Sequence, residues 1–378
     1  MLVHCRHEFY HNQLTYYIAK AQDLSIDLQQ KNLSIFFCIF RLTILSEYYI
    51  LLKSHRTKPN CVKVARQTLT LFVRVRILLR LPHGPLETTG FRVVFYLSLK
   101  KDVNTMRISS VIGLYFSPTG TTRTLVTAAA EQAAQTLGVP CRLISLNTPA
   151  ERETEFHFSA DTLVIVGAPT YAGRLPNKIS PDLRRILHGS GSPAVALVTY
   201  GNRAYENALA ELFRVLTDGG MKPAAGAVCV CQHSIARALA VGRPNEEDCA
   251  EVRRFAAEAA ERIQADEIVL SPAVPGDADS SYYVPTGTSG KPAKFLKSAP
   301  QTDPEKCDGC GRCAALCPMG SISSKDPSVV SGICIKCQAC ILGCPRGAKF
   351  FDDEQFLSHA RMLEQKFAGI HKENEFYL

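Results

Sequence analysis

The 378-residue chain contains no tryptophan and only five methionines. Without tryptophan, a flat aromatic ligand has to be stacked by other rings. No N-terminal stretch has the charged, apolar and small-residue order of a secretory signal, so we expect a reducing cytoplasm. The apolar run from Leu33 to Leu52 is interrupted by Arg41 and Glu47. Because a charge near the middle of a bilayer is costly, this run argues against a membrane anchor.

The formal net charge of +8 is concentrated at the N-terminal end. Residues 1–105 hold fifteen Lys and Arg against six Asp and Glu, or +9, which leaves residues 106–378 at −1. A basic excess usually indicates nucleic acid or anionic membrane as partner, but the larger part of the chain lacks one, so we expect no nucleic-acid partner. We expect the uncertain basic segment 1–105 to lie outside the functional fold, with synthesis beginning at Met106.

From Met106 onward, short apolar runs alternate with helical stretches. Apolar runs buried on both faces and separated by helices predict a doubly wound, five-stranded parallel sheet of the α/β class, here over residues 106–268. The expected strands lie at 110–116, 141–146, 162–168, 192–200 and 226–231, and the clearest helices at 122–137 and 245–264. Residues 269–300 are rich in Pro, Gly and Ser, which is typical of a linker.

The loop after the first strand, "SPTGTTR", places hydroxyl groups around a glycine at the start of a helix. Hydroxyls and backbone N–H groups at a helix N-terminus favour an anion such as a terminal phosphate. Simple helix capping by Ser and Thr is the alternative explanation.

Two further loops follow the third and fourth strands. In an open parallel sheet the ligand lies beyond the carboxyl ends of the strands, so these loops should share the site. Both contain glycine, for close backbone approach, and tyrosines that can stack on a flat heterocycle. The candidates are Pro169, Thr170, Tyr171 and Gly173 in one loop and Tyr200, Gly201, Asn202 and Tyr205 in the other.

The "SPTGTT" loop resembles the FMN phosphate-binding loop of flavodoxins. The resemblance implies phosphate contacts from Ser117, Thr119, Gly120, Thr121 and Thr122, with the flavin ring between the two tyrosine-bearing loops. The chain departs from flavodoxins in lacking their usual tryptophan and an acidic flavin loop. The stretches "QHS" (232–234) and "GRPNEED" (242–248) are similar to those of fused flavodoxin-ferredoxin proteins.

Eight of the fifteen cysteines form two copies of one pattern, Cys-x2-Cys-x2-Cys-x3-Cys-Pro. The second copy begins 27 residues after the first, at Cys334 against Cys307. Soft thiolates in this run suit iron-sulfur clusters, whereas zinc sites typically pair two shorter cysteine knuckles across a longer gap. The seven other cysteines are scattered, which argues against a disulfide framework.

Residues 304–348 resemble bacterial two-cluster ferredoxins, and we expect a small two-cluster α+β domain at 301–350. In that arrangement the fourth cysteine of each run ligates the other cluster. The resemblance therefore implies two [4Fe-4S] clusters, held by two crossed sets of cysteines. We call Cys307, Cys310, Cys313 and Cys344 set A, and Cys317, Cys334, Cys337 and Cys340 set B. Residues 351–378 are expected to form a charged terminal helix and tail.

The pair Cys229 and Cys231, with His233, is the one other grouping of metal-ligand residue types. Buried cysteine is common in strands, and we interpret this pair as structural.

The combination predicts an electron-transfer protein that passes single electrons between two [4Fe-4S] clusters and FMN, with redox proteins as donors and acceptors. Neither a catalytic triad nor a G-x-G-x-x-G motif for NAD(P)H is present. Two alternatives stay open: an FMN-dependent oxidoreductase that reduces a small acceptor such as a quinone, and a redox-sensing interaction module. The pattern indicates neither the oligomeric state nor the direction of electron flow.

Overall fold

The computed structural model describes residues 107–265 and 272–378. The expectations about the basic segment 1–105, including a start at Met106, lie outside these residues. The chain divides into two units, Met1–Asn104 and Thr105–Leu378, and the second is described below.

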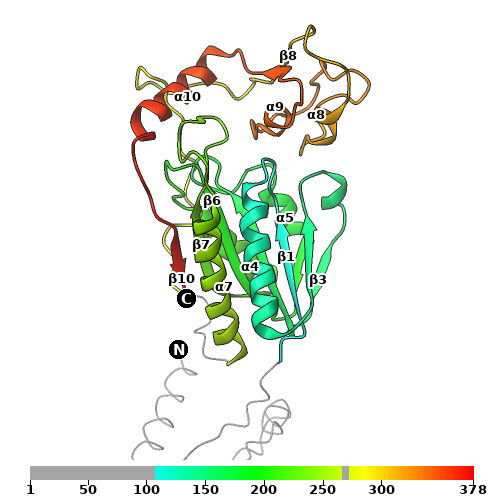
Figure 1. The fold of residues 1–378 in the computed structure, drawn as a ribbon, viewed down its shortest axis with the longest axis vertical. Coiled ribbons are helices and arrows are strands. Elements are labelled where there is room, and N and C mark those ends of the chain that lie inside the picture. Colours follow the sequence, from blue (N-terminus) through cyan, green and yellow to red (C-terminus); the bar gives the residue numbers. More distant parts are fainter. Residues whose placement is uncertain (1–106, 266–271) are drawn as a thin grey trace, which may run out of the picture. The chain divides into compact units, whose positions relative to one another are not determined.

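A six-stranded sheet forms the centre of this unit, in the order β10-β7-β6-β4-β1-β2 (Figure 1). Five neighbouring strands pair in parallel, as the apolar runs predict. They are β1 (Ser110–Tyr115), β2 (Cys141–Ser145), β4 (Thr162–Pro169), β6 (Pro193–Tyr200) and β7 (Lys222–Val230). Their order, 2-1-3-4-5 in sequence, is that of a flavodoxin-like doubly wound sheet. The predicted fold class is confirmed.

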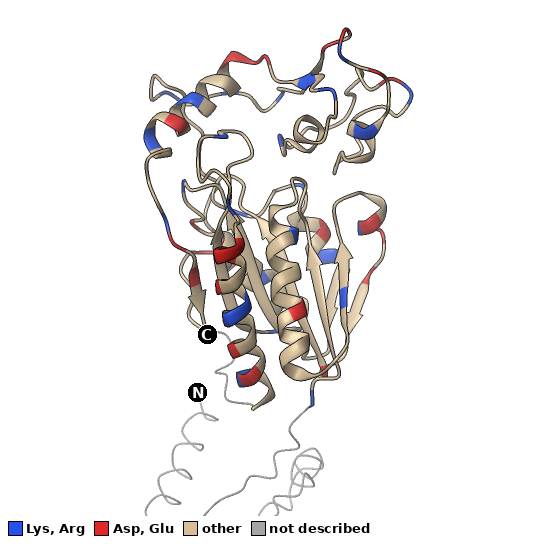
Figure 2. Ribbon diagram, in the orientation of Figure 1, with Lys and Arg blue, Asp and Glu red and all other residues tan. Residues whose placement is uncertain are grey.

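Helices cover both faces of the sheet. On one face, α4 (Thr121–Leu137) and α7 (Glu246–Gln264) bury alanine, valine and phenylalanine side chains against the strands. On the other, α5 (Ser180–Ile186) and α6 (Ala208–Asp218) bury mainly leucine and isoleucine. The first turn of α7 holds three acidic residues, whose negative charge interacts favourably with the positive end of the helix dipole (Figure 2). Two apolar cores result, one on each side of the sheet.

Three short elements complete this part of the chain. The 3-10 helix η1 (Ala150–Arg152) follows β2, and β3 (Phe156–Phe158) pairs in parallel with β5 (Leu187–Gly189).

The cysteine-rich region has little regular structure. It holds two single-turn helices, α8 (Arg312–Ala315) and α9 (Ala339–Leu342), and a short antiparallel pair, β8 (Gln301–Thr302) with β9 (Lys349–Phe350). Each helix begins after a residue in the left-handed region, Gly311 at φ 70° and Gln338 at φ 67°. These residues are 27 positions apart, so the sequence repeat is also a repeat of backbone conformation.

The C-terminal residues return to the sheet. After α10 (Glu354–Phe367), strand β10 (Glu375–Tyr377) pairs antiparallel with β7 as the sixth strand. The terminal helix is predicted from the sequence, but the strand is not. Within residues 107–265 and 272–378, no helix combines the length and apolar character that a bilayer crossing requires.

Candidate functional site

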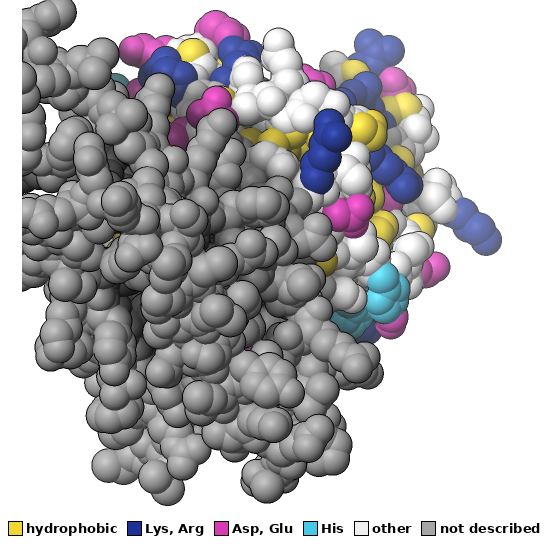
Figure 3. Space-filling view, turned by 90° about the horizontal axis from the view of Figure 1, so that it is seen from below, with side chains coloured by type: hydrophobic (Ala, Val, Ile, Leu, Met, Phe, Trp, Pro, Cys, Tyr) yellow, Lys and Arg dark blue, Asp and Glu magenta, His cyan; other side chains and the backbone are white. Residues whose placement is uncertain are grey.

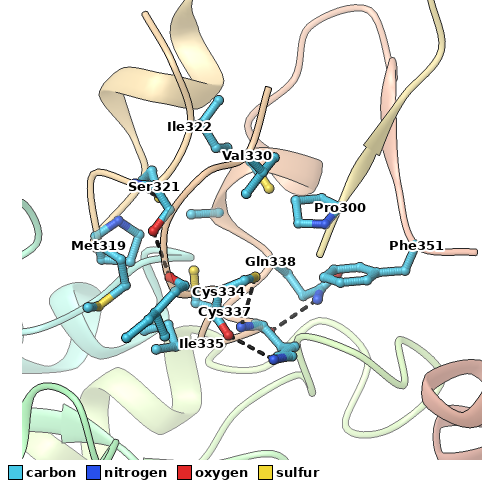
Figure 4. Close-up of a pocket in the computed structure, with 16 residues that line it drawn as sticks. Pro300, Met319, Ser321, Ile322, Val330, Cys334, Ile335, Cys337, Gln338 and Phe351 are labelled. Atoms are coloured by element: carbon cyan, nitrogen blue, oxygen red, sulfur yellow. Dashed lines mark hydrogen bonds between the residues drawn. The ribbon is translucent and has the colours of Figure 1, made fainter. Parts of the chain in front are cut away.

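The four cysteines of set B line one hollow in the C-terminal region (Figure 4). Cys317 comes from the first run and the other three from the second. Most other lining side chains are apolar, among them Pro300, Ile322, Val330 and Phe351. Burial raises the pKa of the Cys340 thiol to about 12 and raises that of Cys337 as well. Metal binding at this hollow therefore has to release thiol protons.

The four cysteines of set A line a second hollow, together with charged residues. Lys349 is among them and is only 3 % exposed. Its ammonium group bonds to the Thr302 hydroxyl at 2.5 Å and to the carbonyl of Pro327. A buried cation beside four thiolates offsets negative charge. The structure thus brings the eight cysteines together in the same two crossed groups that the resemblance implies.

Backbone N–H groups point at the cysteine that ends each run. Ser321 donates to Cys317 Sγ and Ala348 donates to Cys344 Sγ, both at 3.3 Å. Each donor lies four residues after its cysteine, so the repeat preserves this contact. Hydrogen bonds to ligand sulfurs orient them and help to set the reduction potential of a cluster.

The loop between β1 and α4 surrounds the N-terminus of a 17-residue helix. Gly120 is the N-cap at φ 93°, without a side-chain cap, and the first turn has no acidic residue. Ser117 Oγ accepts from the Arg123 N–H at 2.9 Å, whereas the Thr122 hydroxyl bonds to that of Thr199 at 2.8 Å. Among the described residues, the backbone N–H groups of Thr121 and Thr122 have no partner. They suit an anion at this position.

The loop after β4 makes a tight turn next to the cysteine-rich region. Tyr171 and Arg174 exchange backbone hydrogen bonds at 2.7 and 3.2 Å, and Gly173 has φ 79°. The Thr170 hydroxyl is buried without a partner among the described residues. Burial, with the neighbouring thiols of Cys337 and Cys334, raises the pKa of the Tyr171 phenol. Two thiols of set B thus lie within electrostatic range of this loop.

The loop after β6 is more enclosed than the sequence predicts. Tyr200 is 4 % exposed and belongs to the apolar core, and Asn202 is buried at φ 63°. The Tyr205 hydroxyl donates to Glu375 at 2.7 Å. A Cβ on Gly201 would meet the His233 ring at 2.3 Å. The structure therefore places Tyr200 and Tyr205 in packing and tail contacts.

Cys229 and Cys231 are buried in the core between the sheet and the helices α4 and α7. His233 Nδ1 accepts from the N–H groups of Ile235 and Ala236 at 3.1 Å. The ring therefore stabilises the backbone turn that directly follows it. In the part of the chain that the structure describes, no three His, Cys, Asp or Glu side chains converge on a single-ion position.

Two residues that bond to the candidate sites were not anticipated from the sequence. Asn147, after β2, accepts from the Ser117 N–H through Oδ1 at 2.6 Å, and Arg152 bonds to the carbonyl of Pro318. The second contact joins residues 166 positions apart. No local pattern signals such a contact, because it depends on where the cysteine region packs.

Comparison with known proteins bears on both parts of the chain. Two families described as 4Fe-4S binding domains match residues 300–323 and 331–347. No curated protein matched the sequence. Among solved structures, a flavodoxin from the domain Archaea is 19 % identical over 41 % of this chain and 99 % of its own, with a TM-score of 0.29.

Two further structures have similar scores. Oxidised flavodoxin 2 from Bacillus cereus is 18 % identical over 41 % of this chain and 99 % of its own, with a TM-score of 0.29. Rubredoxin oxygen:oxidoreductase from the anaerobe Desulfovibrio gigas is 17 % identical over 44 % of this chain, with a TM-score of 0.30. The chain spans 40 % of that longer protein.

The strand order defines a flavodoxin-like domain, and the two family matches define a 4Fe-4S binding region after it. The chain is therefore a fusion of a flavodoxin-like domain with a 4Fe-4S ferredoxin-type region. Iron-sulfur clusters of this type exchange electrons, so the fusion is an electron-transfer redox protein.

Proposed function

We propose that the protein passes single electrons between two [4Fe-4S] clusters and an FMN bound to the flavodoxin-like domain. The observation that carries the proposal is the grouping of eight cysteines around two hollows, with Met319 and Ile335 of the set B hollow packed against the core of the flavodoxin-like domain. When bound, the clusters exchange one electron each and FMN exchanges one or two.

The two cysteine sets are the proposed cluster ligands. Among the described residues, set B lies in a largely apolar hollow whose one cation is Lys336, while set A has Lys349, Arg312 and Arg346 around it against one carboxylate, Asp308. Positive charge stabilises a reduced, more negative cluster and so raises its reduction potential. We therefore propose that the two clusters differ in potential, with the set A cluster the easier to reduce.

The loop at the start of α4 is the proposed phosphate site. The unpaired N–H groups of Thr121 and Thr122, the left-handed Gly120 and the Ser117 hydroxyl fit a phosphate monoester. The loops 169–173 and 200–205 would flank the ring system. Tyr171 is the proposed stacking residue, while Tyr200, Gly201, Asn202 and Tyr205 shape the second loop from within the fold.

Small redox proteins are the proposed partners. On the face seen in Figure 3, cationic and acidic side chains are interspersed over the described surface, which does not favour a polyanion such as nucleic acid. Because thiolate ligands need a reducing compartment, we also propose a cytoplasmic location.

The test is anaerobic loading of the full chain with iron, sulfide and FMN, followed by rapid mixing with a reduced low-potential ferredoxin. We expect about eight irons and one flavin per chain, and bleaching at cluster wavelengths followed by flavin bleaching without added catalyst. Repeated turnover of an added quinone would favour the oxidoreductase instead. A loaded protein that accepted no electrons from any donor would overturn both the electron-transfer proposal and the oxidoreductase alternative.

A further inference from the structure

The region that holds set B packs against the flavodoxin-like domain. Met319 and Ile335, which both line the set B hollow, also pack against the core beneath α5 and α6. A hydrogen bond accompanies this apolar contact: Arg152 Nη2 donates to the carbonyl of Pro318 at 2.6 Å. Pro318 directly follows Cys317, so the bond fixes the peptide next to a proposed cluster ligand.

Arg152 is a buried cation with all three guanidinium nitrogens engaged. Its side chain is 3 % exposed. Nε pairs with Asp182 Oδ2 at 2.8 Å, and Nη1 donates to the carbonyls of Leu146 and Asn147, both at 2.9 Å. Leaving a buried charge unpaired is expensive, and the planar fork of arginine makes these bonds directional. The position of the Pro318 carbonyl relative to the β2–η1 loop is therefore well defined.

The same loop is bonded to the phosphate site. Asn147 Oδ1 accepts from the Ser117 N–H at 2.6 Å, while the Asn147 carbonyl accepts from Arg152. Ser117 in turn accepts from the Arg123 N–H at the first turn of α4. A continuous chain of hydrogen bonds thus runs from the Pro318 carbonyl, through Arg152 and Asn147, to the proposed phosphate loop.

We propose that Arg152 is a positioning residue that holds the set B region in a fixed place relative to the proposed phosphate loop. It thereby sets the rate of electron exchange between the set B cluster and FMN. This inference rests on the proposed function. It differs from a purely structural role, in which Arg152 would stabilise only the flavodoxin-like domain through Asp182 and the two nearby carbonyls. The Pro318 bond is the contact that separates the two roles.

The first experiment compares the full chain with its Arg152→Lys variant, both anaerobically loaded with clusters and FMN. Lysine keeps the charge but cannot form the fork that reaches Asp182 and Pro318 together. Because electron-transfer rates fall exponentially with the distance between cofactors, we expect flavin reduction after rapid cluster reduction to slow by several-fold. Cofactor content and the rate of cluster reduction should stay unchanged. Arg184→Lys is the control, because Arg184 pairs with Asp218 at the surface.

Hydrogen exchange on the same loaded proteins supplies a second measurement that does not depend on electron transfer. In Arg152→Lys the amides of Gly320 and Ser321, which bond to Cys317, should exchange faster, while those of β4 and β6 should not. A general loss of protection across the sheet would overturn the positioning role in favour of the structural one. Equal flavin-reduction rates in the wild type and Arg152→Lys would overturn this inference alone. A loaded wild type without any flavin reduction would overturn the proposed function as well.

Discussion

At the scale of single residues, the crossed arrangement of the cysteines is the sharpest feature of the site. Cys317 closes the first run but lines the hollow of the second, and Cys344 does the reverse. The alternative is local ligation, in which each run of four would hold its own cluster. The two arrangements differ in which pairs of cysteines share one cluster, and paired substitutions can distinguish them.

The double variant Cys317→Ser with Cys340→Ser should lose one cluster, because both cysteines belong to set B. Iron content is expected to fall from about eight to about four per chain. Local ligation would damage both clusters and leave almost no iron. Iron and sulfide analysis with electron paramagnetic resonance of the reduced protein is the measurement. Cys141→Ser, at an exposed thiol of β2, is the control.

Gly173 is a second residue whose identity matters. At φ 79° a side chain is strained, and a Cβ would come within 1.7 Å of Glu206 Oε2, from the neighbouring loop. The Gly173 carbonyl also accepts from the Asn207 N–H at 2.8 Å, so the two proposed flavin loops are joined at this point.

Gly173→Ala should therefore disturb both loops and weaken FMN binding. A strain of about 1–3 kcal/mol corresponds to a dissociation constant raised on the order of 10-fold. Flavin fluorescence titration of the apoprotein would measure it. Gly369→Ala, at a position with open space around the added Cβ, should bind FMN as the wild type does. Unchanged affinity in Gly173→Ala would remove these loops from the flavin site.

At the scale of elements, the C-terminal tail ties the cysteine-rich region back to the sheet. Asn202 donates to the carbonyls of Phe367 and Ile370 at 3.1 and 2.7 Å. Beyond them β10 pairs with β7, and Glu375 accepts from Tyr205. A short charged tail thereby becomes an edge strand, which protects the otherwise unpaired edge of β7.

Asn374 anchors this tail and offers a test of its importance. Oδ1 accepts from the Val230 N–H at 2.9 Å, and Nδ2 donates to Asp248 at 2.9 Å and Glu251 at 2.6 Å. Asn374→Ala should lower the free energy of unfolding by about 1–3 kcal/mol, seen as a drop in Tm of roughly 2–10 °C. Asn177→Ala, at an exposed position, is the control and should leave the Tm unchanged. A Tm equal to that of the wild type would show that the Asn374 bonds do not contribute to stability.

At the scale of the whole molecule, the second unit starts at Thr105, and the basic segment precedes it. The sheet, both cores and both cysteine sets lie in residues 107–265 and 272–378. A unit with its own cores and sites has what independent folding requires.

A chain starting at Met106 should thus load the same iron, sulfide and flavin per mole as the full chain, and exchange electrons at the same rate. Parallel purification and rapid-mixing measurements of both chains would check this. A shortened chain that aggregates or loads less cofactor would contradict the hypothesis that residues 1–105 lie outside the functional fold. Intact-mass measurement on protein from its native source would show where synthesis begins.

The sequence by itself determined the features that depend on local spacing. Apolar runs between helices indicate the five parallel strands, and the Cys-x2-Cys-x2-Cys-x3-Cys-Pro repeat indicates the ligands, because such patterns reflect contacts within a few residues. Only the tertiary structure decided that residues 375–377 form a sixth strand, that Tyr200 is buried in a core, and that Arg152 reaches Pro318. These contacts join segments more than a hundred residues apart or depend on three-dimensional packing, and no local periodicity encodes them.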